Sequence, residues 1–320
     1  MTIFSRLSAT LGVMLLLRAF VPLTAQPTTP WRDPSPHQVR FVTVDSRVRL
    51  EVLDWGGSGR PVMFIGCYLT AHVYDDIAPK LTDRFHVFAV TRRGVGGSDH
   101  PPTGYSPSRR ADDILEVIET LKMQQPILVG NSCGGDILHT LGGRNPERIG
   151  GLMYLDAAED PTLTLADYGT APVDPSRLPA RARPAEAPVQ FPEAEQRQLR
   201  EHPLDPAIRR AIVDDNKVRP EYAKIRVPVV AVYRTITMEQ ALEQFPPKTD
   251  AERAALNEGY ASARAMLSKW QRDLLAGVPN AKIVELPGAS LYMFLSNEAD
   301  IIRELRAFAA GLPAQSGASR

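Results

Sequence analysis

Short apolar segments alternate with segments of helical periodicity along most of the chain, and this alternation constrains the fold more than any other feature. The apolar segments are rich in β-branched residues and have the length of buried strands. Strands that alternate with helices predict a mostly parallel sheet with helices on both faces. The predicted strands are residues 41–44, 48–53, 61–66, 85–91, 126–130, 149–155, 227–233 and 281–286.

Helical periodicity is clear near the C-terminal end of the chain. Apolar side chains recur on one face over residues 301–308, and either Ser296 or Asn297 is placed to cap this helix. A shorter helix is predicted over residues 73–81, between two of the strands.

Residues 157–225 interrupt the alternation. They are rich in proline, arginine and alanine, and no segment among them has the pattern of a strand. An insertion after the sixth strand lies over the carboxyl edge of the sheet, where parallel sheets bind ligands, so a lid is predicted. A disordered surface loop is the alternative. Beyond the next strand, Thr249 and Glu252 have the spacing of a capping box at the start of a long helix.

The first 25 residues predict a secretory signal peptide. Arg6 precedes the apolar run 7–17, and a small-residue cleavage site ends at Ala25. A membrane anchor or a disordered tail are the alternatives. The expected location is secreted or periplasmic, with no stable membrane span once the peptide is cleaved. The predicted organisation is a signal peptide 1–25, a proline-rich linker 26–38, a folded domain 39–311 that includes the insertion, and a tail 312–320.

The composition argues against several functional classes. Lysine plus arginine and aspartate plus glutamate are 37 each, so no net charge attracts nucleic acid or an anionic membrane. This balance favours a small, uncharged ligand. The two cysteines are too few for a disulfide-dense scaffold or a four-cysteine zinc site. Nothing in the sequence indicates a metal ion or an organic cofactor.

A G-x-S-x-G pattern carries the strongest indication of chemistry. It occupies residues 130–134, between an apolar strand and a helix of apolar periodicity. A serine at such a strand–turn–helix junction is held in a strained conformation with its hydroxyl exposed, which is the arrangement of a nucleophile elbow. Ser132 is therefore the candidate nucleophile. The alternative is that Gly130 and Gly134 simply serve a tight turn.

On these motifs the chain resembles the α/β-hydrolase superfamily over residues 39–311, and in particular exported bacterial serine ester hydrolases. The resemblance implies an eight-stranded, mostly parallel α/β-hydrolase fold with a lid after the sixth strand. The motifs that carry the superfamily resemblance are GNSCG at residues 130–134, RGVGGS at 93–98, RNPERI at 144–149 and IGC at 65–67. The likeness to exported hydrolases rests on TAHVYDDIAPKL at residues 70–81 and FLSNEAD at 294–300.

The resemblance also implies roles for individual residues. Ser132 takes the position of the nucleophile, and the backbone N–H groups of Cys67 and Cys133 take the position of the oxyanion hole. The side chains of the two cysteines either fill the core or form a disulfide, and the sequence leaves both open.

The family's catalytic acid usually follows the seventh strand, but no aspartate stands there and the nearest carboxylate is Glu239. Some members place the acid at the end of the sixth strand, where this chain has Asp156. Asp156 is thus the predicted acid, and Glu239 is the alternative. A third reading gives Asp156 only a structural role at the entry to the insertion.

The family's histidine is replaced by leucine. It follows a P-G-A-x turn, and here Leu291 follows Pro287-Gly288-Ala289-Ser290. No histidine occurs after His202, so an alternative base must come from an earlier part of the chain. His72 and His100 are the candidates, because both are expected on loops at the carboxyl edge of the sheet. The sequence therefore predicts a serine hydrolase of small, uncharged carboxylic esters with impaired activity. The alternatives are a non-catalytic binding pseudoenzyme and an inactivated variant of an active hydrolase.

Overall fold

A computed structural model describes residues 31–168, 174–179 and 189–315 of the chain. The chain divides into two units, Met1–Pro34 and Ser35–Arg320, and the strands and helices described here lie in the second. The predicted signal peptide falls outside the described residues. Among the helices that the structure describes, none combines the length and the apolar character needed to cross a membrane.

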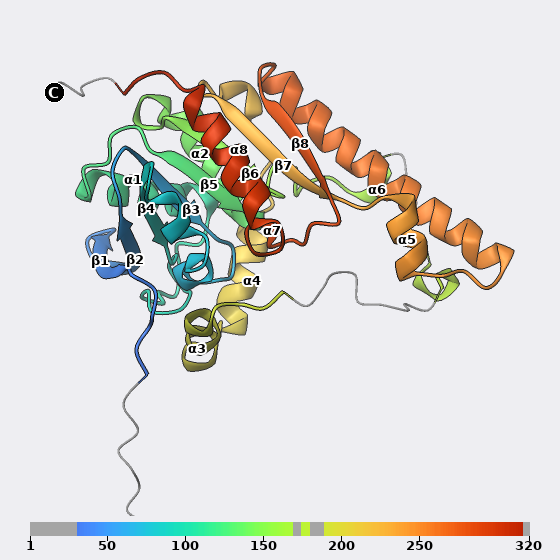
Figure 1. Ribbon diagram of the computed structural model, residues 1–320, viewed down its shortest axis with the longest axis horizontal. Coiled ribbons are helices and arrows are strands. Elements are labelled where there is room, and N and C mark those ends of the chain that lie inside the picture. Colours follow the sequence, from blue (N-terminus) through green and yellow to red (C-terminus); the bar gives the residue numbers. More distant parts are fainter. Residues whose placement is uncertain (1–30, 169–173, 180–188, 316–320) are drawn as a thin grey trace, which may run out of the picture. The chain divides into compact units, whose positions relative to one another are not determined.

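An eight-stranded sheet organises the second unit (Figure 1). Its strands lie in the order β1-β2-β4-β3-β5-β6-β7-β8. β2 is antiparallel to both β1 and β4, and every other neighbouring pair is parallel, which confirms the mostly parallel sheet. The strands are β1 (Gln38–Val44), β2 (Val48–Gly56), β3 (Arg60–Ile65), β4 (Phe85–Val90), β5 (Ile127–Asn131), β6 (Gly151–Leu155), β7 (Val229–Thr235) and β8 (Lys282–Pro287).

The central strands are buried on both faces. Every residue of β5 and of β6 is buried. Successive side chains of a strand point to opposite faces, so Leu128 packs into one apolar cluster while Ile127 and Val129 pack into another. Burial on both faces explains why these strands are continuous apolar segments in the sequence and do not alternate between apolar and polar residues.

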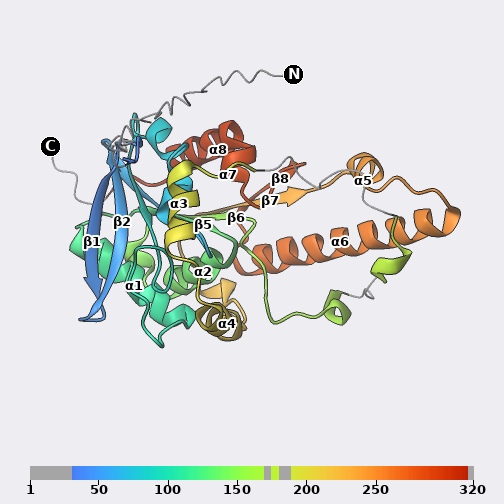
Figure 2. The same cartoon turned by 90° about the horizontal axis from the view of Figure 1, so that it is seen from below.

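Helices cover both faces of the sheet (Figure 2). Apolar residues of α1, α2 and α6 join the cluster that contains Leu128, and those of α8 join the cluster that contains Val129. The helices are α1 (Pro107–Thr120), α2 (Gly135–Arg144), α3 (Glu193–Glu201), α4 (Pro206–Asp215), α5 (Met238–Gln244), α6 (Asp250–Gly277), α7 (Met293–Ser296) and α8 (Glu298–Ala310).

The predicted capping box of α6 is confirmed: the Thr249 side chain accepts from the Glu252 backbone N–H, and Glu252 reciprocates. The predicted side-chain cap of the last helix is wrong. Asn297 occupies the N-cap position of α8 without making a capping hydrogen bond. Ser296 is engaged elsewhere, because its hydroxyl accepts from the backbone N–H of Ser290 at 3.0 Å.

Two 3₁₀ turns, Ala71–Tyr74 and Ala78–Leu81, replace the helix predicted over residues 73–81. Pro79 explains the difference. Proline has no N–H to donate and its ring clashes with the preceding turn, so a helix cannot run through it without a break. The segment instead begins a new turn at Ala78, with Pro79 near the turn's start.

The segment between β6 and β7 contains α3 and α4, and no strand among its described residues. Ile208 and Ile212 of α4 form a small apolar cluster with Tyr105. Glu195 of α3 is fully buried, and its carboxylate accepts hydrogen bonds from the backbone N–H and the hydroxyl of Thr70. The insertion is thus anchored on the loop that follows β3.

Candidate active site

Ser132 stands at the junction of β5 and α2, in a left-handed backbone conformation with φ of 51°. A residue with a side chain adopts this conformation at a cost of about 1–3 kcal/mol, so surrounding packing must enforce it. Gly134 and Gly135 provide that packing. A Cβ on Gly134 would lie 2.4 Å from the Ile65 carbonyl oxygen, and one on Gly135 would lie 2.0 Å from that of Ala157. The glycines therefore let the elbow press against the ends of β3 and β6.

Cys67 and Cys133 form a disulfide, with 4.9 Å between their Cα atoms. This resolves the choice that the sequence left open. The bond joins the loop after β3 to the residue that follows Ser132. The two backbone segments that were predicted to supply oxyanion-hole donors are thus held side by side.

Arg92 is a buried cation beside this disulfide. Its Nη2 donates to Cys133 Sγ at 3.5 Å, while Nε and Nη1 have no hydrogen-bond partner among the described residues. Burial, together with the nearby positive charge of Arg110, lowers the pKa of Arg92 to about 9. Burial likewise raises the pKa of Asp136, in the first turn of α2, to about 6. The sequence motifs did not identify Arg92 or Asp136 as site residues. The pair of arginines at 92–93 is the sequence feature that could have drawn attention to Arg92.

Asp156 follows β6 directly, with φ of 49°. Its carboxylate pairs with Arg234 of β7, with 2.6 Å between Oδ2 and Nε, and also accepts from the Arg234 backbone N–H at 3.3 Å. The predicted acid therefore lies at the carboxyl end of the sheet, held by the neighbouring strand. Its arginine partner was not predicted.

The turn before Leu291 keeps a defined shape. Gly288 has φ of 76°, which favours glycine, and its N–H donates to the Thr235 carbonyl at 2.8 Å. Asn131, the last residue of β5, links this turn to the elbow. Its Nδ2 donates to the carbonyl oxygens of Leu291 at 2.9 Å and of Leu155 at 3.0 Å. The Asn131 side chain thus links the elbow at Ser132 both to the residue before Asp156 and to Leu291.

The alternative bases and the alternative acid have other surroundings. His72 is buried, with Nδ1 3.4 Å from Asp75 and Nε2 3.7 Å from Glu51. His100 lies with Nε2 3.0 Å from the Gly96 carbonyl oxygen. Glu239 is exposed in the first turn of α5. The contacts named for the two histidines are with residues other than Ser132, Asp156 and Leu291.

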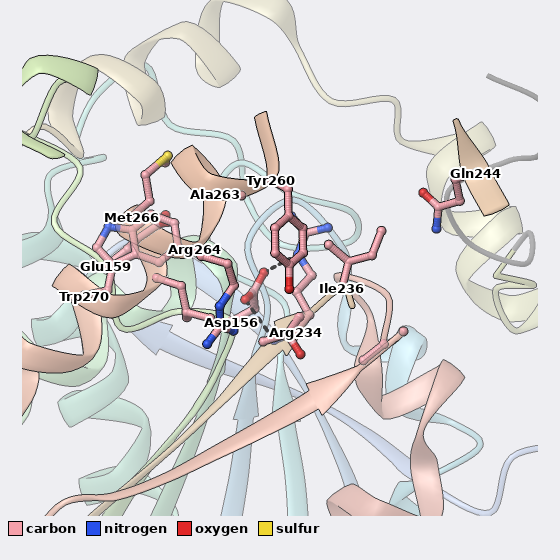
Figure 3. Close-up of a pocket in the computed structure, with 14 residues that line it drawn as sticks. Asp156, Glu159, Arg234, Ile236, Gln244, Tyr260, Ala263, Arg264, Met266 and Trp270 are labelled. Atoms are coloured by element: carbon pink, nitrogen blue, oxygen red, sulfur yellow. Dashed lines mark hydrogen bonds and ion pairs between the residues drawn. The ribbon is translucent and has the colours of Figure 1, made fainter. Parts of the chain in front are cut away.

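Asp156 and Arg234 both line a cavity of about 330 Å³ (Figure 3). Residues of α6 form much of its wall, and Ser132 is not among its lining residues. Glu159 faces this cavity, and burial together with the negative charge of Asp156 raises the pKa of Glu159 to about 7. The cavity therefore adjoins the predicted acid and not the elbow itself.

Comparison with known proteins supports the same interpretation of the fold. The sequence pattern of the alpha/beta hydrolase fold family matches residues 60–222. The 2-(acetamidomethylene)succinate hydrolase of Mesorhizobium japonicum is 34% identical over 110 residues, which are 34% of this chain and 40% of that protein. The AB hydrolase superfamily protein YisY of Bacillus subtilis is 37% identical over 99 residues, 30% of this chain and 37% of that protein. The chain thus spans about two fifths of the length of these curated relatives.

Solved structures extend the likeness to most of the chain. The crystal structure of E-2-(acetamidomethylene)succinate hydrolase matches with a TM-score of 0.57 at 21% identity, covering 86% of this chain and 100% of that one. A bromoperoxidase from Bacillus anthracis matches with a TM-score of 0.61 at 16% identity, covering 85% of this chain and 100% of that one. At this identity the likeness concerns the fold alone. Since the family pattern covers more than half of the sequence and the sheet agrees with it, the protein belongs to the alpha/beta hydrolase fold family.

Proposed function

We propose that the protein is a serine hydrolase of small, uncharged carboxylic esters, with Ser132 as the nucleophile and with activity impaired by Leu291. One observation carries the proposal. Ser132 is held in a strained left-handed conformation at a strand–helix junction, and Asn131 ties the backbone of residue 291 to that junction. A strained serine beside the family's histidine position is the arrangement of a nucleophile elbow. The relative from Mesorhizobium japonicum is named as a hydrolase, which supports hydrolysis as the general class of reaction.

In the proposed reaction the Ser132 hydroxyl oxygen attacks the ester carbonyl carbon, and its proton must pass to a base. The backbone N–H groups of Cys67 and Cys133 stabilise the negative charge that develops on the carbonyl oxygen. Collapse of the tetrahedral intermediate expels the alcohol, which takes up the proton, and leaves an acyl group on Ser132. Water then repeats the attack, releases the carboxylic acid and restores the serine.

Leu291 removes the base from this scheme. A leucine cannot accept a proton, and a serine hydroxyl is a weak nucleophile without a neighbouring base. An enzyme that lacks one member of its triad keeps an acceleration of roughly 10³–10⁴ over water from the oxyanion hole and binding. We therefore expect slow hydrolysis. Asp156 remains the proposed acid that would orient a histidine at position 291, with Glu239 as the alternative.

A non-catalytic role is the second candidate. The turn at residues 287–290 is intact, yet the residue that follows it is apolar. A ligand-binding pseudoenzyme or an inactivated variant of an active hydrolase would both show this combination. The two differ in whether restoring the histidine restores turnover.

Hydrolysis of short-chain nitrophenyl esters tests the proposal. The protein is compared with Leu291→His, and Ser132→Ala in the Leu291→His background is the matched control. We expect Leu291→His to raise the rate by on the order of 10² or more, a typical contribution of a general base, and Ser132→Ala to abolish the gain. A correctly folded Leu291→His protein without any gain favours the binding role. Ordinary esterase rates in the unchanged protein, lost on His72→Ala or His100→Ala, would assign the base to a loop histidine.

We also propose that the chain is exported and that residues 157–225 form a lid. The Cys67–Cys133 disulfide supports export, because disulfides persist mainly in oxidising compartments. The hydrogen bonds between Glu195 and Thr70 support the lid, since they join the insertion to the loop that carries Cys67. Sequencing the N-terminus of the mature protein tests export: a start at residue 26 is expected, and an intact N-terminus in the cytoplasm contradicts it.

A further inference from the structure

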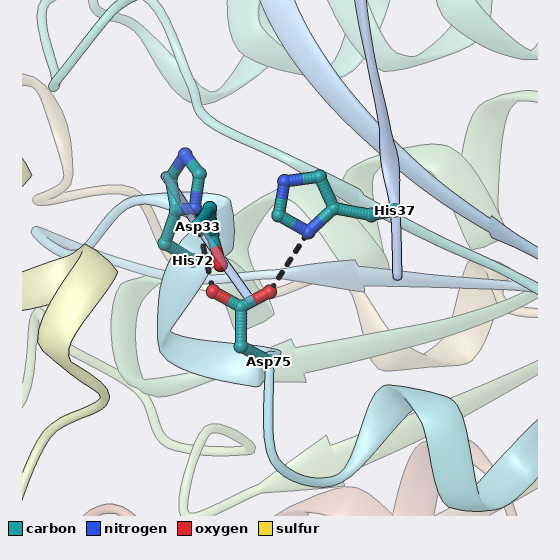
Figure 4. Close-up of side chains that lie close together, drawn as sticks. All are labelled: Asp33, His37, His72 and Asp75. Carbon is teal, nitrogen blue, oxygen red and sulfur yellow. Dashed lines mark hydrogen bonds and ion pairs between the residues drawn. The ribbon is translucent and has the colours of Figure 1, made fainter. Parts of the chain in front are cut away.

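Two imidazoles and a carboxylate meet at a buried point outside the proposed catalytic group. His37 precedes β1, and His72 and Asp75 lie in and directly after the 3₁₀ turn that follows β3. The Asp75 carboxylate stands between the two rings, with Oδ1 3.0 Å from His37 Nδ1 and Oδ2 3.4 Å from His72 Nδ1 (Figure 4). All three side chains are at most 6% exposed.

The spacing of these atoms fits a single metal ion. The candidate ligand atoms of His37, His72 and Asp75 lie within 4.8 Å of one another. Nitrogen and oxygen ligands bind zinc at about 2.0–2.2 Å, so ligand atoms around one ion stand about 3–4 Å apart. Small side-chain rotations therefore suffice to bring the three atoms to one centre.

Glu51 supplies the outer contact that metal-binding histidines commonly have. His72 presents Nδ1 to Asp75 and its other ring nitrogen, Nε2, to Glu51 Oε1 at 3.7 Å. Glu51 is itself buried and accepts a hydrogen bond from the Thr91 hydroxyl at 2.7 Å. A carboxylate behind the imidazole fixes the ring's tautomer and orientation, with Nδ1 on the side of Asp75.

Charge favours a cation at this point. Asp75 and Glu51 place two carboxylates in the interior, and buried charges require compensation. A divalent cation at the three ligand atoms would balance both carboxylates. Imidazole nitrogen with a carboxylate is a ligand set suited to Zn²⁺ and unlike the all-oxygen sets that Ca²⁺ and Mg²⁺ prefer.

We propose that His37, His72 and Asp75 form a Zn²⁺ site, with Glu51 as the positioning residue behind His72. The ion would hold the loop after β3 against the start of β1. Since that loop also carries Cys67 and Thr70, the site would brace the backbone of the proposed oxyanion hole and the contact with α3. The competing arrangement is a metal-free network of the same side chains.

Zinc binding is measured on the full chain purified without a histidine tag, by equilibrium dialysis against Zn²⁺ followed by metal analysis. We expect one Zn²⁺ per chain. His37→Ala and Asp75→Asn should each abolish stoichiometric binding, and Glu51→Gln should weaken the affinity 10- to 100-fold, the usual effect of removing such an outer contact. His86→Ala is the matched control, because His86 also pairs with a buried aspartate, Asp54, at 2.8 Å, but as a single imidazole. It should retain the ion.

A second measurement uses only the unchanged protein and so does not depend on the folding of a variant. Zn²⁺ should raise the melting temperature of the unchanged protein, a chelator should reverse the rise, and Mg²⁺ should have no effect. The proposal is overturned if the unchanged protein takes up no Zn²⁺ and its melting temperature does not respond. It is also overturned if His37→Ala and Asp75→Asn bind Zn²⁺ as well as the His86→Ala control does, since the ion then lies elsewhere.

Discussion

Ser132 holds its left-handed conformation at a tightly packed junction, where Gly134 and Gly135 have no side chains to keep the neighbouring strands away. Gly134 illustrates the constraint, since a Cβ there would lie 2.4 Å from the Ile65 carbonyl oxygen. We expect Gly134→Ala to destabilise the fold by roughly 1–3 kcal/mol, the usual penalty for overpacking a tight interior. Urea unfolding measures the change. Gly311→Ala is the control, because its Cβ would make an ordinary contact of 3.6 Å, and an equal loss in both variants would show that close packing at the elbow is not the cause.

The assignment of the acid is tested in the Leu291→His background. Asp156 directly follows β6, next to the Leu155 carbonyl that accepts from Asn131, whereas Glu239 is exposed on α5. Asp156→Asn should therefore reduce ester hydrolysis by several orders of magnitude, as the loss of a triad carboxylate does, and Glu239→Gln should have little effect. The initial rates of the two double variants decide between them. Equal losses, or a larger loss at Glu239, would transfer the role.

For single residues, the sequence predicts those features that depend on neighbouring positions in the chain. The G-x-S-x-G motif lies within five residues, and its strand–turn–helix setting can be read from its flanks. The partners of the site residues cannot be read in this way. Arg234 pairs with Asp156 across 78 residues, and Asn131 donates to the Leu291 carbonyl across 160. Such contacts depend on strand order, which no local pattern contains.

Among the elements, α3 makes a contact that depends on pH. Glu195 is buried against Thr70, and burial raises the pKa of its carboxyl to about 7 from a usual 4.5, although the hydrogen bonds from Thr70 act in the opposite direction. The folded state then holds this proton more tightly than the unfolded state. Its contribution to stability is present below about pH 4.5 and is lost as the pH rises towards 7.

Replacing this carboxyl should remove that pH dependence. In Glu195→Gln, which keeps an acceptor for the Thr70 N–H, the free energy of unfolding should fall less between pH 5 and 8 than in the unchanged protein, with a difference of up to about 3 kcal/mol. Urea unfolding across this pH range measures it. Glu193→Gln, an exposed site on the same helix, should leave the pH dependence unchanged. Parallel curves for all three proteins would mean that Glu195 does not titrate in this range.

The elements themselves differ in how far local chemistry determines them. The capping box at Thr249 predicts the start of α6 because both of its hydrogen bonds form between neighbouring residues. The last helix is different. Asn297 has the right chemistry and position for a cap but makes no capping hydrogen bond, and the Ser296 hydroxyl accepts from the backbone N–H of Ser290. The preceding turn thus overrides the capping preference of these two residues.

For the whole molecule, the Cys67–Cys133 disulfide is the strongest single link between distant parts of the chain. It closes a loop of 66 residues and joins the end of β3 to the start of α2. A cross-link stabilises a protein mainly by restricting the unfolded chain, and for a loop of this length the expected contribution is about 4 kcal/mol. The cysteine count limited the number of disulfides to one, but the pairing depended on two backbone segments that meet only in the folded sheet.

Removing this link should therefore lower the stability of the entire domain and not only of the site. We expect Cys67→Ser/Cys133→Ser to reduce the melting temperature by roughly 5–10 °C, the shift that follows from about 4 kcal/mol in a domain of this size. Reduction of the unchanged protein with dithiothreitol should produce a similar decrease, whereas the double variant should not respond to dithiothreitol. Thiol titration confirms the redox state in each case. If the fully reduced protein melts at the same temperature as the oxidised one, the bond does not contribute to global stability and its role is confined to aligning the Cys67 and Cys133 backbone beside Ser132.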